Sequence, residues 1–94
     1  MTTFEKFAEL IGRAEVMRVD STFLLTSWIW NPGDKVVVPL AFGYTDADGN
    51  YTEESFLRSD IEDAEFIPSD GRFVIENTNG EKTQITFHKL KDLK

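Results

Sequence analysis

Hydrophobic residues recur at every third or fourth position near the start of the chain. The residues at these steps are Phe4, Phe7, Ala8, Ile11 and Ala14. This spacing places them on one face of an α-helix. Thr2 and Glu5 have the spacing of a capping box at its start, and Gly12 weakens its last turn. The pattern predicts a helix over about residues 3–13.

After residue 20 the pattern changes to alternation between apolar and polar positions. The longest row of alternate apolar residues is Val36, Val38, Leu40, Phe42 and Tyr44. Alternate side chains share one face of a strand, so this row predicts a core-facing strand over residues 35–44. The run 22–30 before it is apolar on both faces, and Asn31-Pro32-Gly33-Asp34 is typical of a type II turn. We therefore expect the two runs to pair as a hairpin.

Turn residues divide the rest of the chain into short strands. The pairs Asp48-Gly49 and Asn79-Gly80 favour tight hairpin turns, and Pro68 begins another reversal. The strands predicted between these turns are 51–58, 72–76 and 83–88. Residues 15–20 fit a short strand or an entry segment, and residues 59–67 fit either a helical turn capped by Ser59 or an extended segment.

One helix followed by short strands that turns join in succession is typical of an antiparallel meander. We expect one α+β domain over residues 1–94, with five or six strands curled into a small barrel or wrapped on the helix. Pro39 lacks an amide hydrogen, so its strand is expected to be an edge or to carry a bulge. The two-sided apolar run 22–30 needs cover from the helix or from a second copy of the chain, which leaves a homodimer open.

Composition narrows the class of protein. The chain has 94 residues, 40% of them hydrophobic, and no cysteine. A core can therefore form, whereas disulfides, thiolate metal sites and cysteine nucleophiles are excluded. The first residues lack the basic and apolar regions of an export signal, and no run is long enough to span a membrane. We expect a cytoplasmic protein that has no membrane partner and no cofactor.

Acidic residues are concentrated in the middle of the chain. Residues 46–70 hold nine acidic residues against one basic residue, Arg58, a net charge of −8 within a chain of formal net charge −7. Such a surface repels phosphate backbones, which argues against direct nucleic-acid binding. It favours a non-catalytic interaction module that binds a basic partner surface, with an inhibitor or a nucleic-acid mimic as sharper forms of this hypothesis. The candidate contact residues are Glu53, Glu54, Asp60, Glu62, Asp63 and Glu65. The alternative is that these charges only keep a small protein soluble.

Aromatic residues point to a second class of function. Trp28 and Trp30 lie two positions apart on one face of a predicted strand, and Tyr44 ends the next strand. Such residues usually pack in a core. Around an apolar pocket, however, Trp28, Trp30 and Tyr44 would bind a small ligand, because indole and phenol rings offer a large contact area and a polar group.

The chain holds no specific motif for catalysis or metal binding. Residues 46–50 begin like a calcium-binding loop, but Tyr51 stands where a glycine is required and Leu57 where a bidentate glutamate is required. His88 is the only histidine, and no serine lies in a nucleophile motif. We therefore expect no metal site and no enzymatic activity.

Overall fold

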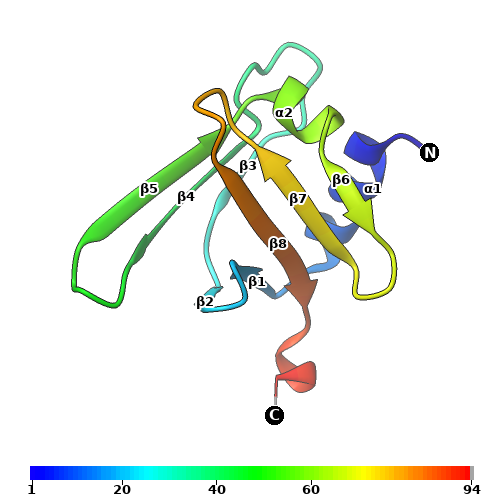
Figure 1. Cartoon of the computed structure of the whole chain (residues 1–94). Helices are drawn as coiled ribbons and strands as arrows, with labels where there is room; N and C mark the ends of the chain where they lie inside the picture. The colour runs from blue at the N-terminus through cyan, green and yellow to red at the C-terminus, as the bar shows by residue number, and fades with distance from the viewer. Residues whose placement is uncertain (94) are drawn as a thin grey trace.

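The computed structural model describes residues 1–93, which form two antiparallel sheets and a helix around one core (Figure 1). One sheet has the strand order β2-β1-β8-β7-β6. Its strands are β1 (Val16–Val19), β2 (Phe23–Leu25), β6 (Glu65–Ile67), β7 (Arg72–Glu76) and β8 (Lys82–His88). The other has the order β3-β4-β5, formed by β3 (Ile29–Trp30), β4 (Leu40–Thr45) and β5 (Tyr51–Phe56). The helical segments are α1 (Thr3–Arg13), α2 (Arg58–Glu62) and the 3₁₀ turn η1 (Leu90–Asp92).

Helix α1 spans the range that its apolar stripe predicts, and it holds the two sheets together. The Thr2 hydroxyl accepts the Glu5 amide at 3.1 Å, and the Glu5 carboxylate accepts the Thr2 amide at 3.0 Å, so the capping box is present. Phe7 is fully buried. Its ring lies 5.5 Å from that of Trp30 on β3 and 5.0 Å from that of Phe73 on β7. The helix therefore supplies the side chain that contacts both sheets.

The apolar run 22–30 belongs to two strands in different sheets rather than to one strand. Leu25 of β2 and Trp30 of β3 both pack in or against the core. They are an odd number of positions apart, so one continuous strand would point them to opposite faces. The irregular residues 26–28 turn the chain from one sheet to the other and direct both side chains inward. This change of sheet explains why the run is apolar on both faces.

The predicted tight hairpin between the two apolar runs is wrong, although the predicted pairing is found. Ile29 pairs with Ala41 and Trp30 with Leu40, but residues 31–39 form a long loop, and Gly33 lacks the positive φ that a type II turn requires. β4 begins only after Pro39, which has no amide hydrogen to donate to a ladder. The first two residues of the predicted apolar row, Val36 and Val38, therefore lie outside the strand, and Val38 is exposed rather than facing the core as predicted.

The sequence of residues 59–67 fits either a helical turn or an extended segment, and the structure contains both. α2 begins at Arg58, so its N-cap is Leu57 rather than the expected Ser59, and β6 follows it. The side chain that caps α2 is Asp60, which accepts the Leu57 amide at 3.0 Å. Because α2 begins at Arg58, β5 ends at Phe56, short of the predicted end at residue 58.

The sheets do not close, so the predicted barrel is wrong. β1 pairs with β8, at the opposite end of the chain, as well as with its neighbour β2. This long-range pairing divides the expected meander between two sheets and leaves β2, β3, β5 and β6 as edge strands. No helix within residues 1–93 has the length and apolar character that a membrane crossing requires.

Candidate functional site

A polar cleft of about 480 Å³ lies between β5 and the β7–β8 hairpin. Its lining consists of Asp20, Tyr44 and residues 52–56, 77–79 and 81–83. Four lining residues are acidic, namely Asp20, Glu53, Glu54 and Glu81, and Lys82 is the one basic residue among them. We call this hollow the acidic cleft.

The acidic cleft runs along the edge of β5. Adjacent side chains in a strand point to opposite faces of the sheet. Residues from both faces of β5, 52–56 without interruption, line the acidic cleft, and β5 is an edge strand of its sheet. The cleft therefore exposes the backbone edge of β5 as well as its acidic side chains.

Glu54 is the hydrogen-bonding centre of the cleft. One carboxylate oxygen accepts from the Tyr44 hydroxyl at 2.9 Å, and the other accepts from the Thr83 hydroxyl at 3.1 Å. Thr83 is buried on β8, so this second bond joins the two sheets. Burial of the phenol, together with the hydrogen bond and negative charge of Glu54, raises the pKa of Tyr44 above its ordinary value. The phenol therefore remains a donor to the carboxylate.

A second group of acidic side chains continues from the end of the cleft. Asp60, Asp63, Glu76 and Asn77 line a small hollow beside α2. Asn77 also lines the acidic cleft, so the two hollows share a wall. We call Asp60, Asp63 and Glu76 the acidic ledge. Of the six acidic residues singled out in the sequence, Glu53 and Glu54 lie in the cleft and Asp60 and Asp63 on the ledge.

The other two candidate acidic residues lie elsewhere. Glu62 forms an ion pair of 3.1 Å with Arg58, and Glu65 is on β6, at the far edge of the five-stranded sheet. The remaining ion pairs within residues 1–93 are Glu9 with Arg13 and Asp70 with Arg72. None of the described ion pairs involves a carboxylate of the cleft or the ledge. The negative charge of these two regions therefore has no cation of the described chain within ion-pairing distance.

The three aromatic residues singled out in the sequence are placed apart. Trp30 packs against the rings of Phe4 and Phe7 on α1. Tyr44 lines the acidic cleft, and its ring stacks on that of Phe23 at 4.4 Å. Trp28 lines a different hollow, which we call the outer groove. Trp28, Trp30 and Tyr44 therefore do not line one common pocket.

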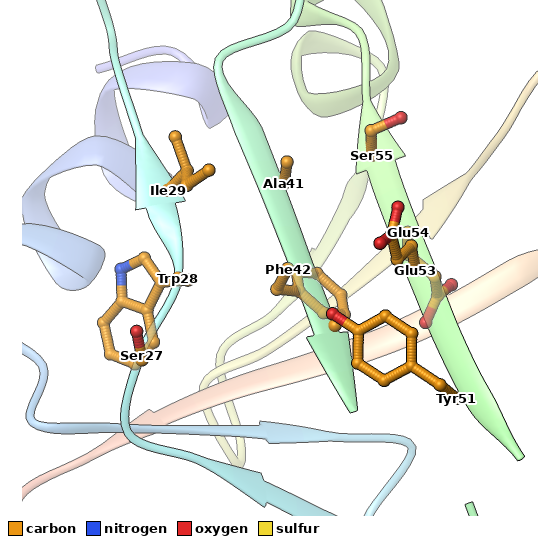
Figure 2. Close-up of a pocket in the computed structure, with 10 residues that line it drawn as sticks. Ser27, Trp28, Ile29, Ala41, Phe42, Tyr51, Glu53, Glu54 and Ser55 are labelled. Carbon is orange, nitrogen blue, oxygen red and sulfur yellow. The ribbon is translucent and has the colours of Figure 1, made fainter. Parts of the chain in front are cut away.

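The outer groove lies over the three-stranded sheet and has a volume of about 530 Å³. Its lining residues are Ser27, Trp28, Ile29, Ala41, Phe42, Gly43, Tyr51, Glu53, Glu54 and Ser55. Figure 2 shows the Tyr51 ring extending from β5 across β4. The end of this ring occupies the space that a Cβ atom on Gly43 would need. A glycine at this position therefore allows the tyrosine to lie flat on the sheet.

His88 ends β8, and its Nε2 lies 2.8 Å from the Thr86 hydroxyl. Burial and the positive charge of Arg18 lower the pKa of His88 below its ordinary value. Within residues 1–93, no three His, Asp or Glu side chains are grouped closely enough to hold a metal ion.

Sequence reasoning missed the contributions of Glu81, Lys82 and Thr83 to the cleft. These residues follow the Asn-Gly turn and come beside β5 only through tertiary packing, with Thr83 29 positions from Glu54. No local pattern could have paired them. No family model, curated protein or solved structure matches this chain. Its function is therefore inferred from the geometry and charge of the cleft.

Proposed function

We propose that this protein is a non-catalytic interaction module whose acidic cleft binds a basic surface of a partner protein. One observation carries the proposal: Glu53, Glu54 and Glu81 line a single cleft and form no ion pair within the described chain. Carboxylates that have no cation partner within their own chain attract Lys and Arg side chains of another molecule. The acidic ledge extends the same negative surface beyond the cleft.

The expected role of this charge is to speed encounter with a basic partner and to exclude acidic ones. Its reach is limited by salt, because the screening length is about 8 Å at physiological ionic strength. Affinity would then come from groups that the partner desolvates at short range. In the cleft these groups include the half-buried ring of Tyr44 and the hydroxyl groups of Thr52 and Ser55.

A short basic peptide tests this proposal without knowledge of the partner. The probe is an eight-residue peptide of alternating lysine and threonine, titrated by calorimetry at about 0.02 M and about 0.3 M salt. We expect binding that weakens as salt rises. The double variant Glu53→Lys with Glu81→Lys should lose at least about tenfold in affinity, which corresponds to about 1.4 kcal/mol.

The matched control is the double variant Asp34→Lys with Glu65→Lys. It changes the net charge by the same amount, but Asp34 and Glu65 line neither the cleft nor the ledge. A clearly smaller loss in this control would locate the interaction in the cleft. Equal losses in both double variants would reduce the interaction to overall charge and overturn the proposal.

The outer groove supports a second candidate function, the binding of a small apolar ligand. Ile29 is 70% exposed and Tyr51 66% exposed, and both flank the small residues Ala41 and Gly43. An apolar ring could lie on this surface beside Trp28. In a Trp30→Phe variant the indole fluorescence comes from Trp28 alone. A set of aromatic probe compounds should shift this emission, and an unchanged spectrum would count against the second function.

A further inference from the structure

The free edge of β5 is the longest exposed strand edge in the described chain. β5 has six residues, whereas the other edge strands, β2, β6 and β3, have three, three and two. Figure 1 shows β5 along the margin of the structure, with its hairpin to β4 projecting outward. Proteins commonly keep edge strands short or cover them, because the unpaired backbone groups can pair with another chain. The long free edge of β5 is therefore a candidate site for pairing with another chain.

The hydrogen bonds flanking β4 establish which groups of β5 face outward. Asn31 donates to the Pro39 carbonyl at 2.8 Å, so the backbone groups of Pro39 face β3. Asp46 donates to the Asn50 carbonyl at 2.9 Å, so the backbone groups of Asp46 face the β5 side. Alternate residues in an antiparallel ladder direct their N–H and C=O groups to opposite sides. Leu40 and Phe42 therefore bond to β5, opposite Phe56 and Glu54.

By the same alternation, Tyr51, Glu53 and Ser55 direct their backbone groups away from β4. All three residues are exposed. Within residues 1–93 their N–H and C=O groups take part in no hydrogen bond outside the strand ladder. The groups of Glu53 and Ser55 lie along the acidic cleft, whose lining includes residues 52–56, and Tyr51 comes directly before these residues on β5. An extended segment in the cleft would therefore lie next to a row of free donors and acceptors.

We propose that β5 receives an extended basic segment of a partner protein as a fourth strand of the β3-β4-β5 sheet. This inference rests on the proposed function and names the way in which the partner binds. The main-chain bonds would come from Tyr51, Glu53 and Ser55. Glu53 and Glu54, on opposite faces of β5, would lie beside alternate side chains of the added strand.

Charge distinguishes a basic partner from a second copy of this chain. Antiparallel pairing of β5 with β5 of another copy would bring the Glu53-Glu54 pair of each chain beside that of the other. Like charges directly opposite one another destabilise a strand pair, whereas Lys or Arg in the added strand would stabilise it. At about 3.3 Å per residue, the six residues of β5 offer an edge of about 20 Å, enough for a segment of about six residues.

A proline at position 55 tests the backbone pairing separately from the charge. Ser55→Pro removes an outward N–H, leaves the net charge unchanged and spares the bonds to β4. Its matched control is Ser55→Ala. With the alternating lysine-threonine peptide as probe, we expect Ser55→Pro to lose at least about tenfold in affinity and Ser55→Ala to stay within about twofold.

A second measurement covers the case in which the proline variant does not fold. The same peptide with every internal amide N-methylated keeps its charge but cannot donate main-chain hydrogen bonds, so its affinity for the unaltered chain should fall at least about tenfold. If Ser55→Pro binds as Ser55→Ala does, and methylation has no effect, strand addition is overturned.

The remaining outcomes separate this inference from the proposed function. Loss of binding in the Glu53→Lys, Glu81→Lys variant alone would mean that a basic segment occupies the cleft without pairing. Binding unaffected by all these changes would contradict the proposed function itself. A concentration-dependent dimer of the Ser55→Ala chain that Ser55→Pro abolishes would assign the edge to a second copy and overturn the choice of a basic partner.

Discussion

The Thr83 hydroxyl donates to the Glu54 carboxylate at 3.1 Å across the boundary between the two sheets. Since the other oxygen of Glu54 accepts from Tyr44, this carboxylate connects β4, β5 and β8. The bond fixes one wall of the acidic cleft relative to the other. It also holds the Glu54 charge within the cleft rather than in open solvent.

Replacement of Thr83 by valine tests this connection. Valine keeps the shape of the buried side chain but removes the donor, so the chain should lose about 1 kcal/mol in free energy of unfolding. Urea denaturation measures the change. The control is Thr78→Val, at an exposed position that lines the same cleft, which should alter stability by less than about 0.5 kcal/mol. Equal stability of the two variants would show that the bond contributes nothing.

The raised pKa of Tyr44 predicts how the free energy of unfolding changes at alkaline pH. Its pKa is raised in the folded chain, so the folded state keeps a proton that the unfolded state releases near pH 10. This contribution to stability is fully present below about pH 10 and is lost as pH rises further. In Tyr44→Phe the stability should fall less steeply above that pH, as urea midpoints will show. Parallel decline in both chains would contradict the assignment.

Glu54→Gln tests the cause of that raised pKa. It removes the carboxylate charge beside the phenol, so the pKa of Tyr44 should decrease toward its ordinary value while burial still acts on it. In a Tyr51→Phe background, where Tyr44 is the only tyrosine, the absorbance of tyrosinate measures this pKa. A matched change at Glu53, which is not among the causes of the shift, should leave the titration unchanged. An identical titration of Tyr44 in Glu54→Gln and the unaltered chain would exclude Glu54 as a cause.

The lowered pKa of His88 predicts that the free energy of unfolding decreases in mild acid. Burial and Arg18 lower its pKa in the folded state, so its contribution is present above about pH 6.5 and is lost as pH falls through the lower folded value. Because His88 is the only histidine, its ring signals in NMR are unambiguous. Arg18→Gln should raise its pKa, whereas Lys82→Gln should leave it unchanged. A pKa of 6.5 or above in the unaltered chain would contradict this account.

Because Phe7 contacts both sheets, we expect the two sheets to unfold together. Its ring contacts Trp30 of the three-stranded sheet and Phe73 and Phe87 of the five-stranded sheet. Phe7→Ala should therefore cost about 3–5 kcal/mol, measured by urea denaturation. If this variant is unfolded, Phe7→Leu provides a milder change. The control Leu24→Ala, at a position that is 53% exposed, should cost far less, and a comparable cost would contradict a central role for Phe7.

Local signals in the sequence predicted the elements that depend on neighbouring residues. Helix α1 follows from its capping box and apolar stripe, and β7 and β8 follow from alternation around an Asn-Gly turn. The change of sheet at residues 26–28 could not be predicted in this way. It depends on Leu25 and Trp30 facing one core from two sheets, and the pairing of β1 with β8 depends equally on distant residues.

The candidate site shows the same limit. The sequence singled out Glu53 and Glu54 by their charge, but not Glu81 or Thr83, which lie on the opposite wall of the cleft only once the chain is folded. It also grouped Trp28, Trp30 and Tyr44, which the change of sheet separates. The free edge of β5 was not visible either, because strand order decides which strands lie at an edge.

Amide hydrogen exchange at Glu53 and Ser55 tests the central claim most directly. In the free chain both N–H groups face outward from an exposed edge, so we expect rapid exchange. Saturation with the alternating lysine-threonine peptide should slow exchange at Glu53 and Ser55, while Glu54, whose N–H already faces β4, changes less. Unaltered exchange at Glu53 and Ser55 in a chain that has bound the peptide would contradict the addition of a strand at β5.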